Sequence, residues 1–108
     1  MKGKGKMADD KKAEDKKALR RKLETPIEAH GEKITEIEFR EPTAGDIVDC
    51  GDPIDIDFST GGMRFNPAEM TEMMALLAKV PPSTIRAMTP RDWKACAMLL
   101  TTFFLPAP

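Results

Sequence analysis

The sequence has few of the residues that build disulfide frameworks and histidine-based active sites. Its 108 residues include two cysteines, one histidine and no tyrosine. Cys50 and Cys96 are too few for a disulfide framework or a four-ligand zinc site. The single histidine, His30, leaves little for histidine-dependent catalysis. We therefore expect that the protein is not an enzyme and that it needs no cofactor.

Long apolar runs are also missing. No stretch approaches the roughly 20 apolar residues that a membrane-spanning helix needs, so we expect no membrane partner. The first six residues carry three lysines, and no apolar segment follows them, which is unlike a secretory signal peptide. These absences favour an intracellular protein.

Charge is abundant, and it is divided unevenly along the chain. Residues 1–22 hold ten Lys or Arg and four Asp or Glu, a net charge of +6, whereas residues 23–108 carry a net charge of −7. The first segment has too few large apolar side chains to offset the entropy lost on ordering. We predict a charged tail over 1–22, disordered or transiently helical from Asp9 to Leu23, and a single small domain over 23–108.

Two stretches of the domain alternate apolar and polar residues, which is the pattern of half-buried strands. The first covers residues 35–40, and Pro26–Glu28 before it supplies the other strand of a hairpin. The second covers residues 54–58, where the acidic side chains are expected to lie in water. A turn at 59–62 then leads into a short return strand at 63–65.

Helix caps mark the second half of the chain. Thr43 and Ser83 are predicted to begin short helices, whereas Asn66 and Thr89, each followed by a proline, are predicted to begin longer ones. The predicted fold is a small α+β domain, with an N-terminal β-hairpin region followed by a mainly helical C-terminal half.

Methionine is frequent, with eight copies in the chain. A methionine stripe at helical spacing is usually core, but methionine also builds adaptable binding surfaces. Two interpretations therefore stay open: core alone, or core together with a binding groove. The candidate partner-contact residues, some of which must be core, are Met70, Met73, Met74, Leu77, Met98, Leu99 and Phe103.

A group of five aspartates between residues 46 and 57 suggests a metal site. Asp55 begins a run that resembles the opening of a calcium loop, but Thr60 and Asn66 stand where such a loop needs Gly and Glu. We therefore favour a strand with solvated acids over a metal site. The basic residues of 1–22 could bind nucleic acid, but acidic neighbours and the lack of aromatics favour a solvated tail.

One stretch is distinctive in its order of residues. It follows the first alternating strand and reads Arg40, Glu41, Pro42, Thr43, Ala44, Gly45 and Asp46. An acidic middle, an apolar helix over 74–81 and a last helix that opens at Asp92-Trp93 come after it. Over roughly residues 23–105, this layout resembles the small tail assembly chaperones of long-tailed phages, which are encoded just before the tape measure protein.

The resemblance implies a non-catalytic role. Such chaperones bind the long, apolar, largely helical tape measure protein and keep it soluble until tube subunits polymerise around it. The implied further partners are a second copy of the chain, a frameshift-extended form of it and the tail tube protein. The implied location is the cytoplasm of the infected bacterial host, with absence from the mature virion. The alternative is a minor structural component of the phage tail or virion.

Overall fold

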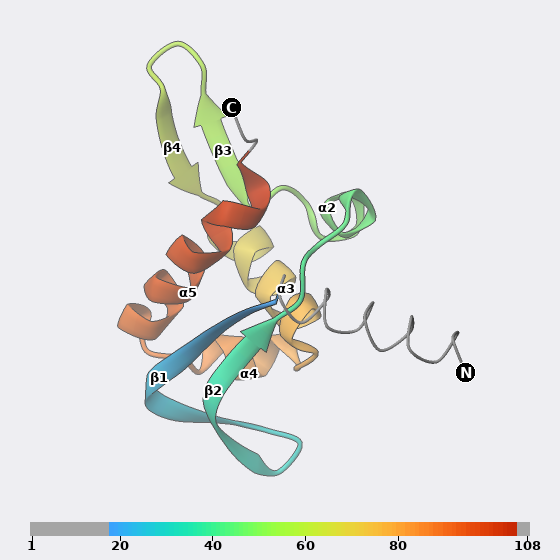
Figure 1. Ribbon diagram of the computed structural model, residues 1–108, viewed down its shortest axis with the longest axis vertical. Coiled ribbons are helices and arrows are strands. Elements are labelled where there is room, and N and C mark those ends of the chain that lie inside the picture. Colours follow the sequence, from blue (N-terminus) through green and yellow to red (C-terminus); the bar gives the residue numbers. More distant parts are fainter. Residues whose placement is uncertain (1–17, 106–108) are drawn as a thin grey trace, which may run out of the picture.

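The computed structural model describes residues 18–105 and shows two antiparallel hairpins and four helices in that part of the chain (Figure 1). The elements are β1 (Leu19–Ala29), β2 (Glu32–Phe39), α2 (Ala44–Cys50), β3 (Ile54–Asp57), β4 (Gly62–Phe65), α3 (Pro67–Ala78), α4 (Pro82–Arg86) and α5 (Pro90–Phe104). The predicted α+β class, with a hairpin first and a mainly helical second half, is confirmed. None of the helices in residues 18–105 is long and apolar enough to cross a bilayer.

The β1–β2 hairpin turns at His30 and Gly31, whose φ angles are 55° and 77°. Two successive residues of positive φ form the tight turn that matches the twist of paired strands. The pairing is interrupted once, because four residues of β1 between Lys22 and Ile27 lie opposite a single residue of β2. β1 therefore bulges at this point, and backbone N–H groups of the bulge bind a side chain from a later helix, as described below.

β1 begins earlier than the sequence predicts. Residues 19–22, assigned above to the tail, pair with residues 36–39 of β2. The prediction of a transient helix is wrong for residues 19–23, because strand pairing and the packing of Leu19 on the core outweigh local helix propensity. The domain start expected at Leu23 thus lies inside β1, and residues 1–17 lie outside the described part of the chain.

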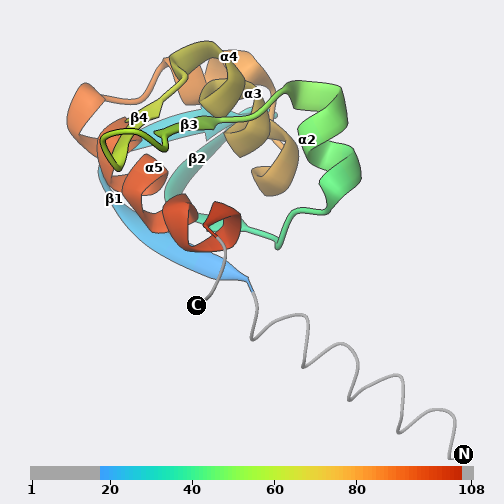
Figure 2. The same cartoon turned by 90° about the horizontal axis from the view of Figure 1, so that it is seen from above.

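The core lies between this hairpin and the helices. α3 packs on β2 and α5 packs on β1, while α2 lies on the other side of α3 from α5 (Figures 1 and 2). The apolar sides of β2, α3 and α5 meet in the middle, as the periodic patterns of these segments require. Side chains with no exposed surface there include Phe39, Met70, Met73, Met74, Ile85 and Leu100.

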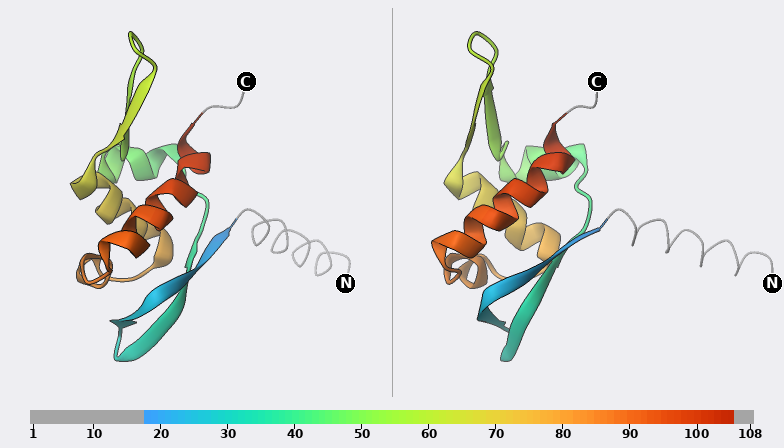
Figure 3. Two further views of the ribbon diagram at one scale, coloured as in Figure 1. Left: turned by 90° about the vertical axis from the view of Figure 1, so that its left-hand side faces the viewer. Right: turned by 60° about the vertical axis from the view of Figure 1, so that its left-hand side comes forward.

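The β3–β4 hairpin projects away from the helices (Figures 1 and 3). Its base is held, since Ile54 is buried and the ring of Phe65 meets that of Trp93 edge-on with centroids 6.4 Å apart. Trp93 in turn donates from Nε1 to Oγ1 of Thr71 at 3.0 Å, which links α5 to α3. The strands predicted at 54–58 and 63–65 are confirmed as a hairpin.

Of the four helix caps that the sequence predicts, two are present in the structure. The hydroxyls of Thr43 and Thr89 accept backbone N–H groups at the starts of α2 and α5, as predicted. Asn66 precedes α3, but its side chain donates to the carbonyl of Asp52 at 2.9 Å and forms no cap bond. The prediction of a cap at Ser83 is wrong, because Ser83 lies inside α4, which begins at a proline.

Candidate partner-binding surface

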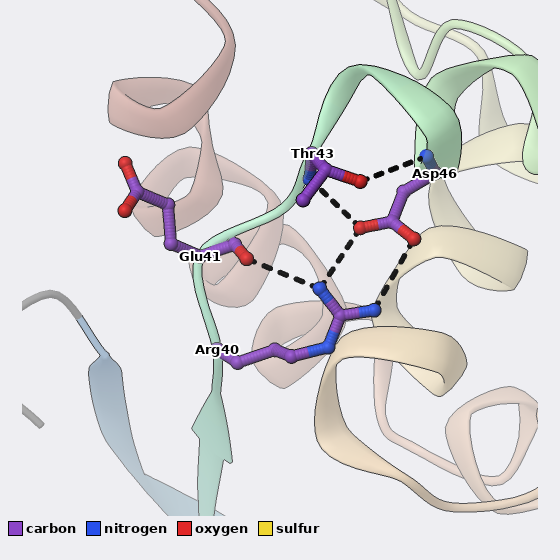
Figure 4. Close-up of polar contacts among 4 residues, drawn as sticks. All are labelled: Arg40, Glu41, Thr43 and Asp46. Atoms are coloured by element: carbon purple, nitrogen blue, oxygen red, sulfur yellow. Dashed lines mark hydrogen bonds and ion pairs between the residues drawn. The ribbon is translucent and has the colours of Figure 1, made fainter. Parts of the chain in front are cut away.

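The distinctive stretch of residues 40–46, which leads from β2 into the first turn of α2, forms a clasp centred on Asp46 (Figure 4). Arg40, just beyond β2, donates from Nη1 to Oδ2 of Asp46 at 2.8 Å and from Nη2 to Oδ1 at 3.2 Å. The backbone N–H of Thr43 donates to the same carboxylate at 2.8 Å, and its hydroxyl accepts from the N–H of Asp46. This is a capping box combined with a bidentate ion pair, so the chain leaves β2 and enters α2 at a fixed angle.

The electrostatics of the clasp follow from these bonds. The hydrogen bond from Arg40, together with that from the Thr43 backbone, lowers the pKa of Asp46 to about 2. The pKa of Arg40 is raised in return, chiefly by the same hydrogen bond. Arg40 also ties the clasp to α3, because its backbone N–H donates to the carbonyl of Leu77 at 3.2 Å. The role of the stretch is thus to join three elements.

The other members of the stretch surround this clasp. Glu41 is exposed, and its carbonyl accepts a bond from Arg40 at 3.1 Å. Pro42 is half-buried, and Ala44 and Gly45 form the exposed first turn of α2. The stretch contains one buried ionisable side chain, Asp46, and that carboxylate is fully engaged by donors.

A second buried carboxylate explains the bulge in β1. The backbone N–H groups of Glu24 and Thr25 donate to the two oxygens of Asp92, each at 3.0 Å. Asp92 lies in the first turn of α5 and is 1% exposed. Burial acts to raise the pKa of Asp92, but the bonds from these two amides bring it below its ordinary value. Asp92 therefore fastens β1 to α5.

Sequence reasoning placed Asp92 only as an acidic residue near a helix start. Its partners lie 67 and 68 residues earlier in the chain. The one local signal was Pro26, because a proline within a strand cannot donate to the ladder and favours an irregularity there.

Large apolar side chains are exposed at several places, and three of them belong to the β3–β4 hairpin. Phe58, at its tip, is 91% exposed, and the paired residues Ile56 and Met63 are 37% and 41% exposed. We call these three residues the hairpin surface. The aspartates of β3 are exposed as predicted, but the apolar residues beyond the base are exposed too, because no other element within residues 18–105 covers them.

A family model described as "Phage tail assembly chaperone proteins, E, or 41 or 14" matches residues 21–105. The chain belongs to this family of phage tail assembly chaperones. The match runs from β1 to the end of α5, which confirms the resemblance noted in the sequence. No curated protein and no solved structure matches the chain.

In this tail assembly chaperone, four of the seven candidate partner-contact residues are core. Met70, Met73 and Met74 of α3 have no exposed surface, and Leu77 is 2% exposed. A partner cannot reach them while the fold is as described. The apolar stripe that these residues form on α3 faces β2 and the other helices, because so small a domain needs all of these side chains to complete its core.

The remaining three candidates lie on α5. Met98 is 60% exposed, whereas Leu99 and Phe103 are half-buried and pack against the core. Met98 is therefore the one member of the predicted set that is open to a partner over most of its surface. The hairpin surface was absent from that set, since alternation shows that a strand has two unlike faces but does not say whether either is covered.

The cysteines of the chaperone are placed as structural residues. Cys96 is fully buried, and burial raises the pKa of its thiol to about 11. Cys50, half-buried at the end of α2, also has a pKa raised by burial. Both thiols are therefore protonated at neutral pH, which disfavours a nucleophilic role. Within residues 18–105, acidic, histidine and cysteine side chains do not gather in threes as a metal site would require.

Proposed function

We propose that this tail assembly chaperone binds the tape measure protein and keeps it soluble until the tail tube polymerises around it. The observation that carries the proposal is the exposed hairpin surface on a domain whose own core is already closed. Apolar groups that a small domain leaves in water without a folding role mark a site for another protein.

The character of the exposed residues suits a long apolar partner. Phe58, Met63 and Met98 are exposed side chains that are aromatic or flexible. Such residues contact many different apolar sequences weakly, which is what a repetitive helical partner demands. A deep, shaped pocket would instead select one small ligand.

The proposal extends to where the protein acts and what else it meets. The chaperone works in the cytoplasm of the infected bacterial host, without a cofactor, and is left out of the mature virion. The tail tube protein displaces it from the tape measure protein. A second copy of the chain and a frameshift-extended form are further proposed partners.

Co-expression with the long protein encoded immediately downstream tests the proposal. We expect the downstream protein to be insoluble alone and soluble in a complex that purifies with this chain. The control is a co-expressed variant carrying Leu77→Asp, which places a charge in the core and removes the folded chaperone without changing its expression signals. Equal insolubility with and without the wild-type chain would refute the proposal.

Mass spectrometry of purified particles separates the chaperone from a minor structural component of the tail. We expect the tape measure protein to be present and this chain to be absent. A fixed number of copies of this chain in each particle would instead assign it to the virion.

A further inference from the structure

We infer that a groove between α3, α4 and the start of α5 binds an acidic segment of another protein, in which carboxylates flank a large apolar side chain. The groove is separate from the hairpin surface, whose three residues do not line it. Its use therefore goes beyond the proposed function, which rests on the hairpin surface.

The groove has a volume of about 350 Å³ and a largely apolar lining. Ile85 of α4 and Met88 just after it are buried, and Trp93 of α5 is half-buried. Pro67 and Pro90, which begin α3 and α5, are exposed beside them. The groove is open to solvent rather than enclosed, so it suits a side chain presented by a larger molecule better than a small ligand, which a pocket would bury on most sides.

Trp93 gives the groove an ordered wall. Its Nε1 donates to Oγ1 of Thr71 at 3.0 Å and its ring meets that of Phe65 edge-on, so the indole is held in place before any partner binds. A side chain that is already ordered loses little entropy on binding. Tryptophan is also among the residues on which the binding energy of protein interfaces is concentrated. The groove is therefore preorganised for an apolar side chain of a partner.

Two cations line this groove. Arg86 lies in the last turn of α4 and Lys94 lies in α5, and both side chains are exposed. Within residues 18–105, neither cation forms an ion pair, and no acidic side chain lines the groove. Cations without a counter-charge beside an apolar lining are complementary to a ligand that carries both negative charge and an apolar group.

The charge of the rest of the domain narrows the choice of ligand. Residues 23–78 contain three Lys or Arg and thirteen Asp or Glu, a net charge of −10, whereas residues 79–105 contain four and one, a net charge of +3. The one acid of the second range, Asp92, is buried and bonded to β1. A nucleic acid needs cations along a length of its backbone, and the acidic part of the domain would repel it. A short acidic segment of a protein needs only the two cations of the groove.

Calorimetry with designed peptides tests the inference on the full-length chain. One short peptide carries a central leucine between pairs of glutamates, and a second carries lysine in place of each glutamate. We expect the glutamate peptide to bind and to weaken as salt is raised, whereas the lysine peptide should not bind. A third peptide, with serine in place of leucine, should bind about 10-fold more weakly than the first, because it brings no apolar group to Trp93.

Substitutions of exposed cations locate the contact. Arg86→Gln and Lys94→Gln should each weaken binding of the glutamate peptide by about 3-fold, and the double variant by about 10-fold. The matched control is Arg91→Gln, which removes an exposed cation of α5 that does not line the groove and should leave binding unchanged. Combining Arg86→Glu with Lys94→Glu should abolish binding of the glutamate peptide and create binding of the lysine peptide. Because these side chains are exposed, the thermal midpoints should stay close to that of the wild type.

Several results would overturn the inference. Equal binding of the glutamate and lysine peptides would remove the charge selection, and a loss in Arg91→Gln as large as that in Lys94→Gln would remove the groove as the site. Tighter binding of a single-stranded oligonucleotide, lost in the charge-reversed variant, would assign the groove to nucleic acid. Self-association of the wild type that the same variant abolishes would assign it to a second copy of the chain.

The peptide titrations need no tape measure protein. They therefore decide the use of the groove even where co-expression refutes the proposed function, and a negative titration leaves the proposed function standing.

Discussion

Two carboxylates, Asp46 and Asp92, are buried in a chain that carries most of its charge on the surface. Each accepts several hydrogen bonds, and each has a pKa below its ordinary value. A buried carboxylate that is paired in this way stabilises the folded state only while it is ionised. Because of these two residues, the stability of the folded domain depends on pH in the acidic range.

For Asp46 we predict an effect on stability that depends on pH. The substitution Asp46→Asn removes the ion pair with Arg40, and at pH 7 it should lower the free energy of unfolding by about 1 to 2 kcal/mol. The folded-state pKa of about 2 lies below the unfolded value of about 4. The wild-type advantage should therefore be complete above pH 4 and should be lost as the pH falls through 2.

Urea denaturation at several pH values measures this difference. Asp49→Asn is the matched control, since Asp49 is an exposed acid on the same helix and its loss should change stability by less than about 0.5 kcal/mol. A constant gap between Asp46→Asn and wild type from pH 7 to pH 2 would contradict the assigned role of the carboxylate.

At the scale of elements, the fastening of β1 to α5 holds the first hairpin against the helices. The bulge in β1 turns two backbone N–H groups toward Asp92. The irregular part of the strand thus supplies the hydrogen-bond donors, and the first turn of the helix supplies the acceptor. Within the described part of the chain, no element fastens the outer half of the second hairpin in this way. The two hairpins thus differ in how they are covered: helices pack on the first hairpin, whereas the apolar side chains in the outer half of the second are exposed.

We predict that Asp92→Asn loosens the fastened hairpin. The new amide group would face one of the N–H groups of Glu24 and Thr25, and an unpaired buried donor costs about 1 to 3 kcal/mol. Hydrogen exchange should become faster at these two amides before it changes elsewhere. Arg91→Ala is the control, because the ion pair of Arg91 with Glu24 is exposed and contributes little.

Local signals in the sequence predict the elements well. The turn at Gly31, the caps at Thr43 and Thr89 and the alternation around Ile37 each depend on a few neighbouring residues, and each is found in the structure. The strand at residues 19–23 was missed because its residues favour a helix locally, and only pairing with β2 makes them a strand.

Local signals of this kind do not predict contacts between segments that are distant in the sequence. The bonds of Asp92 with β1 join residues far apart in the chain. The bidentate bond between Arg40 and Asp46 depends on the angle between β2 and α2, and the spacing of the two residues in the sequence does not give that angle. The same limit applies to the candidate surface: the stripe of Met70 was predicted correctly as a stripe, but its burial and the exposure of Phe58 depend on which layers meet.

At the scale of the whole molecule, the start of β1 decides how much of the charged N-terminal segment the domain needs. We predict that a chain lacking residues 1–22 is less stable than one lacking residues 1–17, by about 2 kcal/mol or more. The longer deletion removes four strand pairs and the packing of Leu19 on the core. Comparison of the urea midpoints of the two truncations measures the difference, and equal midpoints would return the boundary to Leu23.

The junction of Trp93 with Phe65 and Thr71 has a practical consequence. Trp93 is the single tryptophan of a chain without tyrosine, so nearly all of the protein's intrinsic fluorescence comes from this one ring. The ring belongs to α5, is bonded to α3 and touches the end of β4. Its emission therefore reports, without any added label, whether the protruding hairpin keeps its angle to the body of the domain.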